Sequence, residues 1–270
     1  MKTPRLIWQN KVSPIKSEQV ILSLFEKHLA PNTSLISSLL FGENKALLEH
    51  LLDQYKGKIK LIYLDPPFDS DANYHRNIRL RGKKTTYRLK KQQYQDQWEP
   101  HEYLQFIYER LFLLKDLLTE DGSIYLHADW HRIHHLRLLM DEVFGEENLL
   151  NEIIWHHDFG GRSPNFLARK HDNLLLYRKG TSWTFNIETL PDLPYQGNLH
   201  RYQKKNPKKG KKPTAVWHDI KVPSDFVWDI AYENKMSSHN TGYPTQKPIE
   251  LLRRIIALSS NPDDLILDPF

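Results

Sequence analysis

Lys60-Leu-Ile-Tyr-Leu-Asp-Pro-Pro-Phe68 is an apolar run that stops at an acid, two prolines and an aromatic ring. The run is typical of a hydrophobic strand, and open α/β sheets bind their ligands beyond the carboxyl ends of their strands. Each proline fixes φ at about −65° and removes an N–H donor, so the backbone there presents carbonyl oxygens only. The stretch therefore predicts a rigid shelf, residues 65–68, at the carboxyl edge of a sheet.

Three groups meet on this shelf: the Asp65 carboxylate, the Pro66 carbonyl and the Phe68 ring, with Pro67 adding rigidity. They suit an exocyclic amino group on a planar base, because the two acceptors take its N–H bonds and the ring stacks on its face. A strand that simply ends in a proline turn explains the same four residues. That alternative stays open on these residues alone.

The rest of the chain alternates between strand and helix patterns. Strands are expected at 35–41, 58–64, 123–128, 152–156 and 173–178, and helices at 45–55, 101–118, 132–144 and 249–258. The alternation predicts an α/β fold with a doubly wound, mostly parallel, Rossmann-like sheet, in which residues 35–64 form a right-handed βαβ unit. Residues 69–100 show no clean period and are expected as a long loop. The first 35 residues are expected as an arm with a short helix at 18–28.

The composition is that of an ordinary globular chain: 270 residues, 39% hydrophobic and 26% charged. The absence of cysteine excludes disulfides and thiolate-held metals. No apolar run approaches the roughly 20 residues of a membrane span, and the N-terminus lacks the core of a signal peptide. We therefore expect a cytoplasmic protein without a membrane partner.

The net charge of +5 is modest, but the basic residues are concentrated in two blocks. Residues 72–95 carry eight Lys/Arg, residues 201–213 carry seven, and neither block contains an acid. Such blocks favour a nucleic acid partner, although solvated loops without a ligand have the same composition. The candidate DNA contacts are Arg76, Arg79, Arg81, Lys83, Lys84 and Arg88 in the first block and Lys204, Lys205, Lys208, Lys209, Lys211 and Lys212 in the second.

Four histidines, His127, His131, His134 and His135, lie close together in the sequence. No His-Glu-x-x-His pattern and no neighbouring set of ligands accompanies them. We therefore expect solvated helix histidines rather than a metal site.

A second set of motifs stands near the end of the chain, Thr245-Gln-Lys-Pro248 before a predicted helix and Asp268-Pro-Phe270 after a predicted strand. Together with the Asp-Pro-Pro-Phe shelf, they resemble the DNA amino-methyltransferases whose Asp-Pro-Pro-Tyr/Phe motif precedes the cofactor motif. The similarity continues through Gly122-Ser-Ile-Tyr-Leu-His127, Phe144-Gly145 and Asn151-Glu-Ile-Ile-Trp155, and it covers most of residues 36–180 and 241–270.

The resemblance implies an S-adenosylmethionine-dependent enzyme that methylates a base extruded from double-stranded DNA. Asp65 and the Pro66 carbonyl would accept hydrogen bonds from the target amino group, and Phe68 would stack on the base, which contributes roughly 1–3 kcal/mol. Asp at the first motif position is commoner in the adenine-N6 enzymes of this family, so adenine is favoured over cytosine-N4. The implied cofactor contacts are Glu43, Gln246, Lys247, Pro248, Asp268, Pro269 and Phe270.

Some of these residues have a purely structural explanation. Glu43 is a first-turn carboxylate that would stabilise a helix N-terminus, and Thr245 and Pro248 suit the start of a helix. Neither explanation accounts for Lys247, because a cation is unfavourable in a first turn.

The resemblance also divides the chain: an arm at 1–35, the catalytic half of the methyltransferase domain at 36–180, an irregular β-rich target-recognition insert at 181–240 and the start of the cofactor-binding half at 241–270.

In the family a glycine-rich cofactor loop follows Asp-Pro-Phe, whereas this sequence stops at Phe270. We therefore expect an N-terminal fragment with an incomplete sheet. A catalytically dead DNA-binding remnant and a split enzyme completed by a C-terminal fragment are alternatives, and a restriction subunit is a further expected partner.

Overall fold

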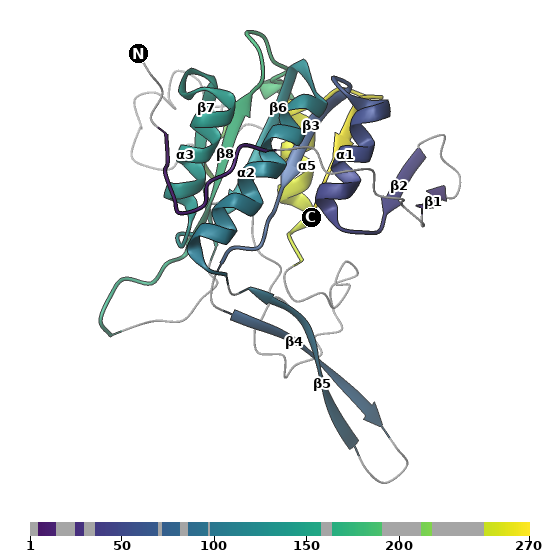
Figure 1. The fold of residues 1–270 in the computed structure, drawn as a ribbon, viewed down its shortest axis with the longest axis vertical. Helices are drawn as coiled ribbons and strands as arrows, with labels where there is room; N and C mark the ends of the chain where they lie inside the picture. Colours follow the sequence, from purple (N-terminus) through teal and green to yellow (C-terminus); the bar gives the residue numbers. More distant parts are fainter. Residues whose placement is uncertain are drawn as a thin grey trace, which may run out of the picture.

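The computed structural model describes residues 5–14, 25–29, 36–69, 72–81, 86–96, 98–157, 164–190, 212–217 and 246–270. At the centre of these residues is a six-stranded sheet in the order β10-β3-β6-β8-β7-β9 (Figure 1). Its strands are β3 (Ile59–Leu64), β6 (Leu118–Ala128), β7 (Leu149–His156), β8 (His171–Arg178), β9 (Val216–Trp217) and β10 (Leu265–Leu267). The helices around it are α1 (Asn44–Tyr55), α2 (Pro100–Leu117), α3 (Ile133–Phe144) and α5 (Ile249–Ser259).

All strands of this sheet except β8 run in one direction. β10, β3 and β6 pair parallel, β8 pairs antiparallel with both β6 and β7, and β9 pairs parallel with β7. Helices α2 and α3 cover one face and α5 covers the other (Figure 1). The predicted doubly wound, mostly parallel α/β fold is therefore confirmed. Because β10, β3 and β6 end at the same edge, the residues that follow them lie close together.

Strand β3 lies inside the sheet, and all six of its residues are buried. A strand covered on both faces reads as a continuous apolar run, which is the pattern seen in the sequence. Leu61 and Tyr63 face α5, where they pack with Leu251 and Ile255. The alternate residues of β3 face the opposite side, because successive side chains of a strand point to opposite faces.

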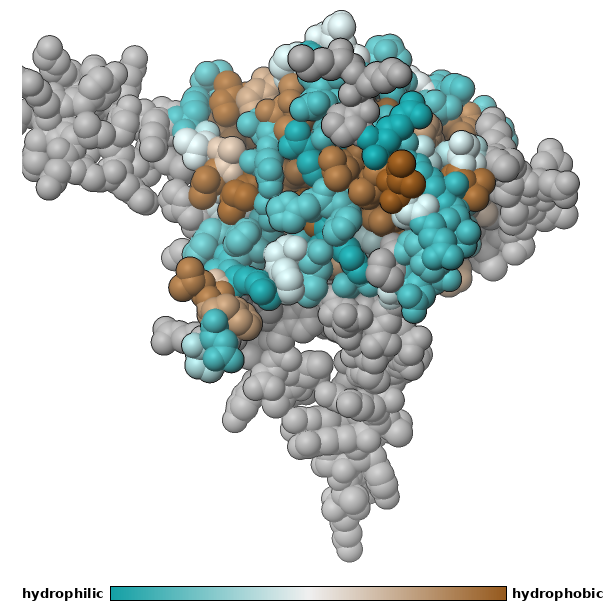
Figure 2. All heavy atoms as spheres, turned by 60° about the vertical axis from the view of Figure 1, so that its left-hand side comes forward, coloured by the Kyte–Doolittle hydropathy of each residue, from teal (hydrophilic) through white to brown (hydrophobic). Residues whose placement is uncertain are grey.

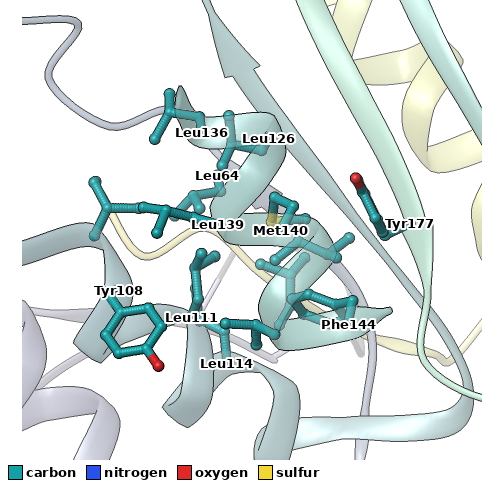
Figure 3. Close-up of a cluster of buried hydrophobic side chains, with 14 of the residues drawn as sticks. Leu64, Tyr108, Leu111, Leu114, Leu126, Leu136, Leu139, Met140, Phe144 and Tyr177 are labelled. Atoms are coloured by element: carbon teal, nitrogen blue, oxygen red, sulfur yellow. The ribbon is translucent and has the colours of Figure 1, made fainter. Parts of the chain in front are cut away.

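The larger core fills the space between the sheet and helices α2 and α3. Figure 3 shows Leu64 and Leu126 from the strands near Leu111 and Leu114 of α2 and Leu139 of α3. Each of these side chains is at most 1% exposed. Full burial of one leucine stabilises the fold by roughly 1.5–3 kcal/mol, so this layer holds β3 and β6 in register beneath the site.

The predicted βαβ unit at residues 35–64 is wrong. Strand β2 (Ile36–Leu40) is absent from the central sheet and pairs antiparallel with β1 (Phe25–Leu29) in a separate two-stranded sheet. Two serines interrupt its apolar pattern, and Leu39 is 61% exposed. The helix expected at 18–28 is also wrong at residues 25–28, which belong to β1, while 18–24 lie outside the described residues.

The long loop expected at 69–100 contains a hairpin. Strands β4 (Ala72–Arg81) and β5 (Thr86–Asp96) pair antiparallel and reach away from the central sheet (Figure 1). The register brings Ile78 opposite Leu89 and Leu80 opposite Tyr87.

Residues 5–14, part of the predicted arm, form a strap over the helix layer. Lys11 donates to the Glu142 carboxylate of α3 at 2.7 Å, and its Nζ lies 4.6 Å from the centre of the Tyr108 ring of α2. Gln105 of α2 accepts from the Val12 N–H at 3.1 Å and donates to the Val12 carbonyl at 3.0 Å. The strap therefore joins α2 to α3.

The described parts of the 181–240 interval belong to the central fold. The short 3₁₀ helix η2 (Ile187–Thr189) precedes Leu190, and Leu190 and Trp217 of β9 are buried in the α5-side core. The remainder of this interval lies outside the described residues.

No helix within the described ranges combines the length and the hydrophobicity that a membrane crossing needs. On the face shown in Figure 2, apolar side chains form small groups separated by hydrophilic ones.

Truncation of a core leucine tests this packing. Leu111→Ala should lower the free energy of unfolding by about 2–5 kcal/mol, because the side chain is fully enclosed and leaves a cavity. Leu265→Ala, at a position 43% exposed on the edge strand β10, should cost under about 1 kcal/mol. Urea denaturation followed by circular dichroism measures both. Equal losses would contradict the described core.

Candidate active site

The Asp-Pro-Pro-Phe shelf directly follows β3 at the carboxyl edge of the sheet. Pro66 is buried, and Asp65, Pro67 and Phe68 are partly buried. Tyr103 of α2 donates its hydroxyl to the Pro67 carbonyl at 2.8 Å, which anchors the turn to the helix layer. The shelf is therefore fixed from the interior while Asp65 keeps access to the outside.

Lys247 meets Asp65 at this edge. Its Nζ donates to Asp65 Oδ2 at 2.7 Å and lies 4.9 Å from the centre of the Phe68 ring. The other carboxylate oxygen, Asp65 Oδ1, is buried and has no hydrogen-bond partner among the described residues. Both side chains are only partly exposed, 15% for Lys247 and 22% for Asp65. A nitrogen donor thus already occupies the acceptor and ring face that the shelf presents.

Asp268 places a second carboxyl group near this pair. Burial raises the pKa of Asp268 to about 6, the Asp65 carboxylate adds to the rise, and the Lys247 ammonium opposes it. Two carboxyl groups therefore share one cation, and the site has a local excess of negative charge near neutral pH.

The turn before α1 supports the end of β10. Asn44 donates to the Pro269 carbonyl at 3.3 Å and accepts from Arg110 Nε at 2.6 Å. Arg110 of α2, 4% exposed, also pairs with Glu43. Burial raises the pKa of Glu43, but the N–H groups of the first helical turn and the Arg110 guanidinium outweigh it, so the pKa is lowered.

Two rings extend this support. The Arg110 guanidinium stacks 3.5 Å from the centre of the Phe106 ring, and Phe106 packs edge-on against Phe270 with 5.9 Å between ring centres. Glu43 also caps α1 by accepting from the Ala46 N–H at 2.9 Å. The structural explanation for Glu43 is thus observed, and the same turn holds the last residues of the chain in place.

A buried polar network beneath the shelf was missed in the sequence. His127 is fully buried on β6, contrary to the expectation of a solvated helix histidine. Its Nδ1 hydrogen-bonds the Tyr63 hydroxyl at 2.7 Å, its Nε2 hydrogen-bonds Asp172 at 3.2 Å, and its ring centre lies 5.7 Å from that of Phe68. Burial opposes ionisation of Asp172, but hydrogen bonds from His127 and His157 outweigh it and lower the pKa of Asp172.

The structure thus brings Asp65, Phe68, Lys247 and Asp268 together, although they come from three distant segments. Gln246 and Pro248 flank Lys247 at the start of α5, with Pro248 as its N-cap, while Thr245 lies outside the described residues.

The predicted DNA contacts are only partly described. Arg76, Arg79 and Arg81 lie on β4 and Arg88 on β5. Lys212 donates to the Leu190 carbonyl at 3.0 Å and pairs with Glu188 at 3.1 Å. The others fall outside the described residues, namely Lys83, Lys84, Lys204, Lys205, Lys208, Lys209 and Lys211. Within the described ranges, no group of three or more His, Asp or Glu residues is arranged to hold a metal ion.

Comparison with known proteins identifies the family. A sequence profile of the DNA methylase family N6_N4_Mtase matches residues 59–270. The chain belongs to this DNA methylase family. The match includes the shelf, α5 and the chain end, which are the segments that the structure brings together at the edge of the sheet.

Curated relatives are similar to this chain at low identity. The type II methyltransferase M.EcaI of Enterobacter cloacae is 25% identical over 89% of this chain and 64% of that protein. The DNA adenine methyltransferase YhdJ of Escherichia coli (strain K12) is 25% identical over 78% of this chain and 64% of that protein. The chain thus spans less than two thirds of the length of either relative.

A solved structure supports the fold of this chain. The PvuII DNA methyltransferase (cytosine-N4-specific) superposes with a TM-score of 0.51 at 18% identity, covering 86% of this chain and 73% of that one. At this identity the likeness concerns the arrangement of helices and strands.

The shifted pKa of Asp268 gives a pH-dependent prediction. The pKa of about 6 in the folded protein lies above the ordinary value of 3.8 for an aspartate, so the protonated form stabilises the fold below about pH 4 and that contribution is lost as the pH rises through 6. Asp268→Asn should therefore raise the free energy of unfolding at about pH 7.5 by on the order of 1–2 kcal/mol, with little gain at about pH 4.

Urea denaturation at the two pH values measures this difference. Asp53→Asn provides the control, because Asp53 is exposed on α1 and lies outside the site. A pH-independent effect of Asp268→Asn would contradict the burial of this carboxyl group.

Proposed function

We propose that this chain carries the target-base site of an S-adenosylmethionine-dependent DNA methyltransferase that modifies the N6 amino group of adenine. The observation that carries the proposal is the position of the Lys247 ammonium, hydrogen-bonded to Asp65 and over the face of Phe68. A target amine needs the same two interactions, an acceptor for its N–H bonds and a ring for its base. Lys247 must leave this position when the target base enters.

The residues at the edge fit a cofactor with a positive charge. The buried Asp65 Oδ1 lacks a hydrogen-bond partner among the described residues. The pKa of Asp268 is raised, and a further cation nearby would lower it by stabilising the ionised carboxylate. Asn44, Pro269 and Phe270 would form one wall of the cofactor site, held by Arg110. When bound, S-adenosylmethionine supplies the electrophilic methyl group.

The chain's own residues orient the nucleophile. Asp65, together with the Pro66 carbonyl, holds the amino group so that its lone pair lies outside the plane of the base. Phe68 stacks on the base and stabilises the positive charge that develops on nitrogen, since a cation over an aromatic face is attracted to it. The Lys247 contact supports this role, because its ammonium lies over the same ring.

Adenine is the proposed target. Asp65 at the first motif position favours adenine-N6 enzymes within the resembled family, and the relative YhdJ is named a DNA adenine methyltransferase. Extrusion of the base from the double helix is part of the proposal, because the amino group cannot be approached in line within the stack.

The basic hairpin β4–β5 is the proposed DNA backbone contact. Its strands carry Arg76, Arg79, Arg81 and Arg88. Such a concentration of basic residues favours a polyanion. Target recognition by the 181–240 interval, a complementary C-terminal segment and a restriction subunit stay predictions.

Modified bases in cellular DNA test the function. The natural gene that encodes this chain is expressed in a host that does not methylate its DNA. The host DNA is then hydrolysed and its bases are analysed by mass spectrometry. N6-methyladenine should appear, and Asp65→Ala should reduce it at least about 100-fold, the typical loss when a group that stabilises the transition state is removed. Asp53→Ala, an exposed change on α1, is the matched control.

Other outcomes have definite meanings. N4-methylcytosine in place of N6-methyladenine would keep the site and change the target. If the protein is expressed and folded and neither modified base appears, the proposed function is wrong.

A further inference from the structure

Exposed aromatic and apolar side chains gather beside the shelf on two segments at the carboxyl edge of the sheet. Trp130 follows β6, and Phe166 and Leu167 lie in residues 164–170, which lead into β8. Trp130 is 39% exposed, Phe166 55% and Leu167 92%. Large apolar side chains that lie together in solvent mark a surface that meets a partner.

Arg169 holds the two segments together. Its guanidinium lies 3.5 Å from the centre of the Trp130 ring and 4.6 Å from that of Phe166. His131 stacks on Trp130 as well, with 3.8 Å between ring centres. No carboxylate in the described part of the chain pairs with Arg169, so the exposed cation is braced on rings and available to an anion.

This surface is tied to the target-base shelf. Arg132, two residues after Trp130, donates to Asp69 at 2.5 Å. Asp69 directly follows Phe68, is 4% exposed and has φ of 52°, a left-handed conformation that few non-glycine residues adopt. The ion pair therefore fixes the distance between the shelf and the Trp130 segment.

The chemistry fits the duplex next to an extruded base. Proteins that unstack DNA insert apolar side chains such as Phe and Leu between base steps, and they fix their position with cations on the phosphates. Residues 164–170 and the hairpin β4–β5 extend beyond the same end of the sheet (Figure 1). An apolar tip, a braced cation and a basic hairpin thus lie on the side where the target base must leave the stack.

We propose that Phe166 and Leu167 form a wedge that enters the base step beside the extruded nucleotide, while Arg169, braced on Trp130, contacts a phosphate. The inference rests on the proposed function, because it requires DNA at this edge. The wedge would lower the free energy needed to extrude the target base, because its apolar side chains replace the base stacking that is lost.

Binding to a weakened duplex tests the wedge. Fluorescence anisotropy compares two labelled duplexes that differ by one mismatched base pair, which opens more easily than a matched pair. The wild-type chain should prefer the mismatched duplex by about fivefold or more, because unstacking a step costs a few kcal/mol. Phe166→Ser with Leu167→Ser should reduce the preference to under about twofold. Ile7→Ser, at a position 87% exposed in the strap, should leave it unchanged.

The phosphate contact has a separate readout. Arg169→Gln should weaken binding to both duplexes alike and lower the slope of log affinity against log salt by about 1. Arg253→Gln is the matched control, because Arg253 is 64% exposed on α5 and pairs with Glu250 of the same helix. Circular dichroism shows whether each variant keeps the wild-type fold.

Different negative results distinguish a failure of the wedge proposal from a failure of the proposed methyltransferase function. An unchanged mismatch preference in the folded double variant, with wild-type DNA binding intact, overturns the wedge and leaves the proposed methyltransferase standing. If the double variant loses a self-association that the wild-type chain shows in the ultracentrifuge, and its DNA binding is unchanged, the surface binds a second copy of the chain. That result also overturns the wedge. No duplex binding by the wild-type chain at low salt removes the wedge, while modified bases in cellular DNA still decide the proposed function.

Discussion

Lys247 and Asp65 stand 182 residues apart, and their ion pair joins the start of α5 to the end of β3. The contact depends on the sheet, because β3 meets the α5–β10 unit through the parallel β3–β10 pairing and through the packing of Leu61 and Tyr63 against α5. It also sets the charge balance of the site, in which one ammonium serves both Asp65 and Asp268. Asp65 adds to the effect of burial on the pKa of Asp268, Lys247 opposes it, and the pair places a cation beside the Phe68 ring.

The sequence predicted the parts of the fold that depend on burial and local pattern. A strand buried on both faces must be apolar throughout, so β3 and the shelf that follows it were recognisable. Lys247 was also informative, although it was expected in the first turn of the helix and lies before the N-cap Pro248. From there the lysine reaches a carboxylate of a different segment.

The errors concern contacts that leave no local trace. Which partner a strand takes is a long-range choice, so β2 was assigned to the central sheet although it pairs with β1. The hairpin β4–β5 was hidden because a few apolar cross-strand pairs are spread among arginines and lysines. His127 was taken as solvated because its spacing from other histidines says nothing of Tyr63 and Asp172, its partners from other strands.

The strap at residues 5–14 has a consequence for the order of events during synthesis. Lys11 leaves the ribosome before its partner Glu142, which follows 131 residues later. At roughly 5–20 residues per second, the first segment waits on the order of ten seconds before it can dock. The strap can therefore join α2 to α3 only after both helices have been made.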